Sequence, residues 1–163
     1  MRVANRVVLA SAVVLAMAPV HMASARQVDN VAQGSFYHLG DAPGNLQGSA
    51  KVVRYDDDTT SLQVHVHGLK PGDTYSVHLH AGACDDRGPH YRHDPDGPAR
   101  PPNELWASSH PDDPSAGITA DQDGNASGSG KAPWRARAEA RSVFIHSPSG
   151  GKGHTAIGCA DLT

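Results

Sequence analysis

Short segments in which apolar and polar residues alternate recur along this chain, and no segment shows a convincing helical period. Alternation is typical of a β-strand with one buried face, because successive side chains of a strand point to opposite sides. The clearest case is residues 61–69, where every second residue from Leu62 to Val66 is apolar. His65 and His67 would then lie on the outward face of the sheet, with a second, weak metal site as the minor alternative.

The same pattern predicts several short strands separated by turns rich in Gly, Asn, Asp and Pro. The expected strands cover residues 28–39, 49–55, 61–69, 118–120, 141–146 and 155–159, with one more around residues 78–80. The expected turns are Asp41–Asn45, Asp56–Asp58, Lys70–Asp73 and Asp121–Asn125. Short strands at this spacing indicate an all-β antiparallel sandwich or barrel.

Residues 81–117 interrupt this regularity with many Pro, Asp, Arg and His residues and no period. So long an irregular stretch counts against the strand assignment unless the loop has a function. The stretch carries four polar residues suited to a site, His90, His93, Glu104 and His110. We therefore interpret it as an active-site loop, and we interpret Trp106 within it and Trp134 beyond it as packing residues.

The first 25 residues have the features of a secretory signal peptide. Arg2 and Arg6 give a positive start, residues 7–20 are mainly apolar, and Ala23–Ala25 match an A-x-A cleavage site. The apolar stretch is short for a membrane span, which needs about 20 residues, and an uncleaved anchor is the alternative. We expect one domain over residues 26–163, secreted to the periplasm or the extracellular space after cleavage near Ala25.

Charge narrows the possible partners of that domain. The formal net charge is −3 with His neutral, and removal of residues 1–25 takes away two arginines and no acids, which makes it −5. The chain contains no run of basic residues. This balance argues against nucleic acid and anionic membranes as partners.

The chain has two cysteines, Cys84 and Cys159. In an oxidising compartment an even pair is expected to form a disulfide, with two free buried thiols as the alternative. A bridge that closes so long a loop stabilises a fold by about 4 kcal/mol in the chain-entropy model. Two cysteines this far apart do not indicate a cysteine-rich zinc module.

A His-x-His pair, His78 and His80, follows the turn at residues 70–73. On a strand the two rings would project from one face about 6–7 Å apart, which suits two ligands of one metal ion. A polar face of an ordinary amphipathic strand is the alternative for so short a motif. Cys84 comes four residues after the pair, and His90 follows a Gly-Pro.

Five separated motifs, taken together, favour the metal site over an ordinary amphipathic strand. The chain has eleven histidines, and the sequences HLH, Cys84, GPH, SVFIH and Cys159 occur in the order found in copper/zinc superoxide dismutases. The chain resembles this family over roughly residues 62–162. The resemblance implies an immunoglobulin-like Greek-key β-sandwich or flattened barrel with a long active-site loop. It also implies copper as cofactor, superoxide as substrate, and dioxygen and hydrogen peroxide as products.

The resemblance assigns roles to individual residues. The three terminal copper ligands would be His78, His80 and His146. The histidine that bridges copper and zinc in the family would be His90. Cys84 and Cys159 would form the family's disulfide. Imidazole nitrogens suit copper in both oxidation states. In the family the bridging histidine leaves reduced copper, takes a proton and helps to deliver it to peroxide, so its far nitrogen needs a partner.

A zinc site is doubtful, because the family's H-x-G-D-L segment is not present and residues 100–106 read RPPNELW instead. His110 and Asp113 keep a His-x-x-Asp spacing and could form a variant zinc site with His93 or Asp96. Their alternative is a set of solvated loop residues, because zinc needs four well-placed ligands. The chain resembles more closely the copper-only branch, in which a carboxylate replaces zinc. By that resemblance Glu104 would accept a hydrogen bond from His90, and a solvated glutamate is its alternative.

The arginine that guides superoxide in the family has no counterpart here. The equivalent offset from Cys159 gives Ala156, and Lys152 and His154 are the nearby cationic candidates. Lysine lacks the rigid fork of arginine, and loss of steering charge slows anion capture by roughly 10–10³-fold. The first hypothesis is a secreted copper-dependent superoxide dismutase with His90, Glu104 and Lys152 as catalytic residues. The alternative is a secreted copper-binding, storage or delivery protein on the same fold.

Overall fold

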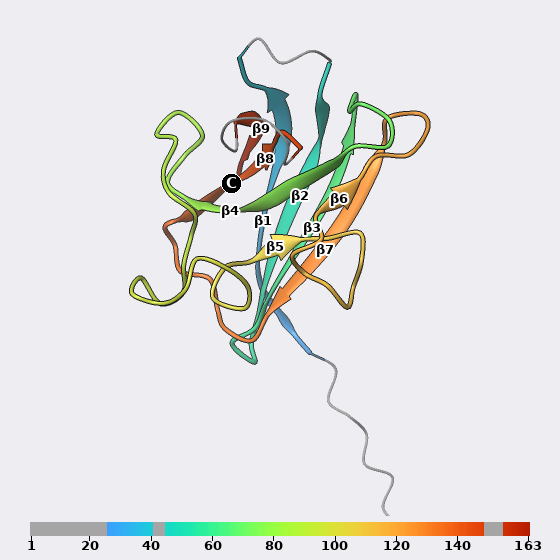
Figure 1. Cartoon of the computed structure of the whole chain (residues 1–163). Coiled ribbons are helices and arrows are strands. Elements are labelled where there is room, and N and C mark those ends of the chain that lie inside the picture. Colours follow the sequence, from blue (N-terminus) through green and yellow to red (C-terminus); the bar gives the residue numbers. More distant parts are fainter. Residues whose placement is uncertain (1–25, 41–44, 149–154) are drawn as a thin grey trace, which may run out of the picture.

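The computed structural model describes residues 26–40, 45–148 and 155–163, and these form nine β-strands and no helix (Figure 1). The strands are β1 Val28–His38, β2 Gln47–Tyr55, β3 Thr60–His67, β4 Thr74–Ala81, β5 Trp106–Ala107, β6 Ile118–Thr119, β7 Ala126–Ala132, β8 Ala140–His146 and β9 Ala156–Asp161. The described residues contain no helix long and apolar enough to cross a membrane. The expected signal peptide, Lys152 and His154 lie outside the described residues.

All strand pairs are antiparallel, in the order β5-β4-β8-β9-β1-β2-β3-β7, with β6 paired to β4. The two halves of the sheet join where β9 pairs with β1. They meet again at a bridge between Ser108 and Ser129, beside β5 and β7. The sheet is therefore nearly closed into a flattened barrel, and the all-β prediction is confirmed.

Three connections cross from one half of the barrel to the other. They lead from β3 to β4, from β6 to β7 and from β7 to β8, so none of these pairs of consecutive strands is joined as a hairpin. Non-sequential neighbours of this kind are the feature of Greek-key sandwiches. As a result β4 and β8, which are far apart in the sequence, pair along most of their length.

The interior of the barrel is filled by alternate residues of the long strands, as the periodicity predicts. Leu62, Val64 and Val66 on β3 are buried, whereas His65 and His67 on the same strand are exposed. On β4 the inward residues Val77 and Leu79 are also buried. Burial of such side chains supplies the main stabilisation, about 1.5–3 kcal/mol for each large one.

Strand β7 was not predicted, because its sequence ASGSGKA lacks large apolar residues. It nevertheless pairs with β3 over seven residues. Its small residues have a packing reason. A Cβ on Gly130 would lie 1.9 Å from the carbonyl oxygen of Trp106, and one on Gly128 would lie 2.4 Å from the Ile118 side chain. Glycine therefore lets the short strands β5 and β6 pack closely against β7.

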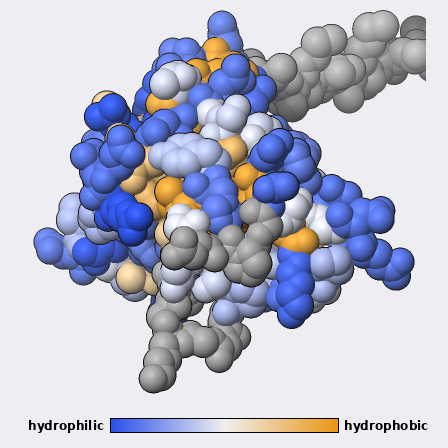
Figure 2. Space-filling view, turned by 90° about the horizontal axis from the view of Figure 1, so that it is seen from above, coloured by the Kyte–Doolittle hydropathy of each residue, from blue (hydrophilic) through white to orange (hydrophobic). Residues whose placement is uncertain are grey.

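The surface of the molecule is mainly polar. In the view from above, apolar residues appear only as small patches among polar ones (Figure 2). The large apolar side chains that the structure exposes within its described residues are Val28, Val31 and Tyr37, all on β1. Single exposed apolar residues of this kind are normal for a folded domain.

Candidate metal centre

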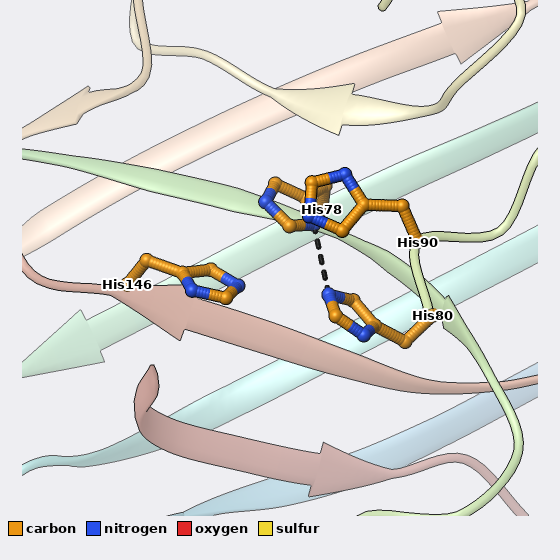
Figure 3. A group of neighbouring side chains, drawn as sticks. All are labelled: His78, His80, His90 and His146. Atoms are coloured by element: carbon orange, nitrogen blue, oxygen red, sulfur yellow. Dashed lines mark hydrogen bonds between the residues drawn. The ribbon is translucent and has the colours of Figure 1, made fainter. Parts of the chain in front are cut away.

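Four histidines from three parts of the chain meet on the outer face of β4. His78 and His80 lie two residues apart on β4, His146 ends the neighbouring strand β8, and His90 comes from the loop after β4. One nitrogen of each ring belongs to a group whose atoms all lie within 4.8 Å of one another (Figure 3). Across residues 26–40, 45–148 and 155–163, no other group of three or more potential ligand residues is arranged in this way.

The pairing of β4 with β8 places three of the four rings. His78 lies opposite Phe144 and Ser76 lies opposite His146, so His146 is diagonal to His78 across the two strands. The ring centroids of His78 and His146 are 4.6 Å apart. His80 lies on the same face as His78 because residues two apart on a strand share a face. Its ring centroid is 4.9 Å from that of His78.

The fourth ring is placed by the return of the loop along β4. Two backbone hydrogen bonds of 2.9 Å hold residues 89–91 against the strand, one from Ala81 N–H to Pro89 O and one from Tyr91 N–H to Leu79 O. Gly88 permits this close approach, because a Cβ there would lie 1.8 Å from the Ala81 carbonyl oxygen. The ring of His90 thereby comes within 3.8 Å of the ring of His78, centroid to centroid.

Three of the four rings are buried, and the fourth is partly exposed. His78, His80 and His146 are at most 5% exposed, whereas the side chain of His90 is 38% exposed. Three imidazoles are therefore shielded from water, and the fourth lies at the entrance. Such an arrangement holds an ion firmly while a small molecule can reach it.

His80 is held in the form that binds a metal. Burial is the largest of the effects that together lower its pKa to about 4. The charges of His90 and His146 also lower the pKa, whereas the hydrogen bond to Gly88 and the charge of Glu104 raise it. The ring is therefore neutral at pH 7, and a neutral imidazole is the ligand form. Its Nδ1 lies 2.7 Å from the Gly88 carbonyl oxygen, which can only accept, so Nδ1 carries the proton. The other nitrogen, Nε2, faces His78 Nδ1 at 3.1 Å.

Glu104 supports His90 from behind, and the predicted hydrogen bond between them is present. His90 Nδ1 lies 3.0 Å from Glu104 Oε2, and Trp106 Nε1–H donates to the same oxygen at 2.7 Å. Glu104 is 2% exposed. Burial raises its pKa, but the hydrogen bonds from His90 and Trp106 outweigh burial and lower the pKa overall. An ionised carboxylate only accepts, so His90 Nδ1 carries a proton and its Nε2 is the free ligand atom.

Trp106 does more than the packing we predicted. Besides its hydrogen bond to Glu104, its ring lies 5.0 Å from the ring of His78, centroid to centroid. It therefore contacts one ligand and holds the carboxylate that orients another. The sequence signal was its position two residues after Glu104. Trp134 agrees with the prediction, since it is 9% exposed within the core.

A disulfide between Cys84 and Cys159 joins the start of the loop to β9, as predicted. Both cysteines are buried and pack with Phe144, whose ring lies 4.3 Å from that of His80. The backbone N–H of Cys84 also donates to Asp161 Oδ1 at 2.8 Å. The bridge therefore ties the segment that leads to His90 to the strand next to His146.

The residues considered for a zinc site lie elsewhere and are not brought together with one another as a group of ligands. The ring of His93 stacks on Trp134, with centroids 4.9 Å apart and planes 7° apart. Asp113 is exposed and accepts hydrogen bonds from the backbone and the hydroxyl of Ser115. His110 and Asp96 are also exposed. None of these residues belongs to the four-histidine group.

Ala156 lies beside the site. It is the first residue of β9 and pairs with His146. The position three residues before Cys159 is therefore next to a candidate ligand and bears only a methyl group.

The four imidazoles can hold one metal ion. Imidazole is a ligand for zinc, copper, iron and nickel. The partner of His90 is of the kind that orients a metal-bound histidine through its second nitrogen. In comparisons with known proteins, no family model matches the chain and no curated protein matches it.

Proposed function

We propose that this protein is an extracytoplasmic copper-dependent superoxide dismutase. The observation that carries the proposal is the convergence of four imidazoles on one point, with the outermost, His90, hydrogen-bonded to the buried carboxylate of Glu104. The motif order shared with copper/zinc superoxide dismutases supports the same assignment. The disulfide fits an oxidising compartment outside the cytoplasm.

In this proposal two superoxide ions and two protons become dioxygen and hydrogen peroxide. Copper, when bound, supplies the redox chemistry by accepting an electron from one superoxide and passing it to the next. His78, His80 and His146 hold the ion from the buried side. His90, the most exposed of the four, can take up a proton at Nε2 and release it toward the entrance, while Glu104 keeps the Nδ1 proton in place.

A second function is favoured by Ala156. Without a guanidinium beside His146, superoxide would be drawn to the site more slowly, because local charge steers small anions. The protein would then bind, store or deliver copper with little turnover. The four-histidine group serves either function, and so does the carboxylate of Glu104, which orients His90 as a ligand whether or not that histidine also handles a proton.

Superoxide removal by the copper-loaded full chain separates these functions. We expect the wild-type chain to remove superoxide much faster than the His78→Ala/His80→Ala double variant. A His65→Ala/His67→Ala double variant is the matched control, because it removes the same pair of residues from an exposed strand face. It should keep the wild-type rate. A wild-type chain that binds copper yet is no faster than the first variant would leave copper binding as the function.

A further inference from the structure

A cavity of about 520 Å³ lies at one end of the barrel, away from the metal centre. It is formed where β1 and β2 meet the segment that crosses from β7 to β8. Four arginines line it, Arg54 on β2, Arg135 and Arg137 on the crossing segment, and Arg141 on β8. Arg141 and His146 are five residues apart along β8, which corresponds to roughly 17 Å. The cavity is therefore a separate site.

Only two of these four positive charges are balanced by the protein. Arg135 pairs with Asp29, and Arg137 pairs with Glu139. In the described part of the chain no carboxylate lies within ion-pair distance of Arg54 or Arg141. The cavity thus carries an excess of two positive charges in a protein whose overall charge is negative.

Arg54 is the more unusual of the two. It is 8% exposed, and its hydrogen-bond partners are all uncharged oxygens. Two contacts are short, Nε–H to the Ala136 carbonyl at 2.8 Å and Nη1–H to Asn30 Oδ1 at 3.0 Å. The Nη2 contacts to the Arg137 and Ala140 carbonyls are both 3.4 Å, which is long for a hydrogen bond. A buried charge is costly unless an opposite charge accompanies it.

The surroundings of Arg54 would favour the binding of an anion. Burial lowers the pKa of its guanidinium, and the charge of Arg135 lowers it further. An anion in the cavity would oppose both effects. The guanidinium is also held in a fixed orientation by its two short hydrogen bonds. Its Nη2 group, which makes only the two long contacts to carbonyl oxygens, could exchange them for an anion without further ordering of the side chain.

We propose that this cavity binds a small ligand that carries a tetrahedral, doubly charged oxyanion of the phosphate type. The planar fork of a guanidinium matches two oxygens of such a group, and charge-assisted hydrogen bonds are about twice as strong as neutral ones. The cavity volume lies within the range of small-molecule sites, about 300–1,000 Å³. It therefore has room for the free ion and also for a small phosphate ester.

Titration of the full chain with inorganic phosphate tests this site. The chain is first freed of metal with a chelator, its disulfide intact, so that no anion binds through a metal. Sodium chloride keeps the ionic strength constant, and binding is followed by calorimetry and by the NMR signals of the arginine Nε–H groups. We expect saturable binding that shifts the Arg54 signal. Arg141→Gln should weaken it by about tenfold, the value of one charged hydrogen bond.

Arg100→Gln is the matched control, because it removes one positive charge from an exposed loop outside the cavity. It should bind phosphate as the wild type does. Arg54→Lys keeps the charge without the fork and should also weaken binding by about tenfold, provided that its thermal unfolding matches the wild type. If that variant is unstable, Arg141→Gln alone decides.

Glycerol phosphate, titrated in the same way, distinguishes the two sources of the oxyanion. Tighter binding than inorganic phosphate identifies a phosphate ester as the ligand, and weaker binding identifies the free ion. The proposal is overturned if the wild type shows no saturable binding at millimolar phosphate. It is equally overturned if Arg141→Gln binds like the wild type, or if Arg100→Gln weakens binding as much as Arg141→Gln does.

Discussion

The chain contains the pattern His-x-His on two consecutive strands, and the two copies have different fates. His65 and His67 on β3 are exposed, and each has one polar neighbour, Ser127 for His65 and Gln47 for His67. His78 and His80 on β4 are buried within a group of four imidazoles. The strand pattern that brings two rings to one face is the same in both places.

The two strands differ in the segments that pack over them. Only β4 has a loop that folds back along it, adds His90 and brings the buried carboxylate of Glu104 behind that ring. Of these two strands, only β4 pairs with a strand that ends in a histidine, β8. A His-x-His pair is thus half of a metal site at most, and its function depends on residues that arrive from other parts of the chain.

The largest expected effect on copper binding comes from removal of the histidine pair on β4, and removal of the pair on β3 provides the comparison. His78→Ala/His80→Ala should lower the affinity for copper by more than about a hundredfold, because loss of a supporting partner alone costs about 10–100-fold. His65→Ala/His67→Ala should leave the affinity unchanged. Competition with a copper chelator measures both. Equal losses in the two variants would mean that the two pairs do not differ as binding sites.

Removal of the disulfide should act mainly through the unfolded chain, which gains the conformational freedom that the bridge takes away. Cys84→Ala/Cys159→Ala should lower the free energy of unfolding by about 4 kcal/mol, because the bridge spans a sequence separation of 75 residues. Denaturant unfolding monitored by tryptophan fluorescence measures this loss. A loss below about 1 kcal/mol would show that the loop is held mainly by its other contacts.

Acid should destabilise the metal-free protein through His80. Its pKa of about 4 in the folded state lies below the ordinary value of 6.5, so the unfolded chain binds more protons between these values. The stabilisation is fully present above pH 6.5 and is lost as the pH falls toward 4, by up to about 3 kcal/mol. Unfolding free energies at several pH values measure the slope.

The variant His80→Gln should flatten that slope, whereas the matched variant His65→Gln on the exposed strand should keep it. A wild-type slope in His80→Gln would assign the acid sensitivity to other groups.

Loss of the carboxylate behind His90 should have the smallest of these effects. Glu104→Gln keeps the shape of the side chain but removes its charge, and the affinity for copper should fall by about 10–100-fold. Glu139→Gln is the matched control, since Glu139 is exposed and pairs with Arg137. Copper titration of both variants tests the role of Glu104. An unchanged copper affinity in Glu104→Gln would show that the charge of Glu104 does not support copper binding through His90.

The strands with large alternating residues could be predicted from the sequence, and β7 could not. The spacing of Leu62, Val64 and Val66 alone predicts a buried face. In β7, by contrast, Gly128 and Gly130 are small because other backbone segments approach them, and that reason appears only after folding. A strand whose residues are small because of its packing neighbours shows no hydrophobic periodicity in the sequence.

The candidate site follows the same division. The family resemblance predicted that His78, His80, His90 and His146 would meet. The resemblance to the copper-only branch predicted the contact between His90 and Glu104. The contact of Trp106 with both His78 and Glu104 was missed, because it depends on how residues 104–106 turn toward β4. The arginine cavity was missed as well, because Arg54 and Arg141 are far apart in the sequence and meet only across the barrel.

The most direct test of the central claim is the anomalous diffraction of a crystal grown with copper, measured at the copper absorption edge. We predict one strong peak within bonding distance, about 2.0–2.2 Å, of a nitrogen of His78, His80 and His146, with His90 as fourth ligand or immediately adjacent. A peak at His65 and His67, or copper bound by fewer than three of the four histidines, would contradict the account.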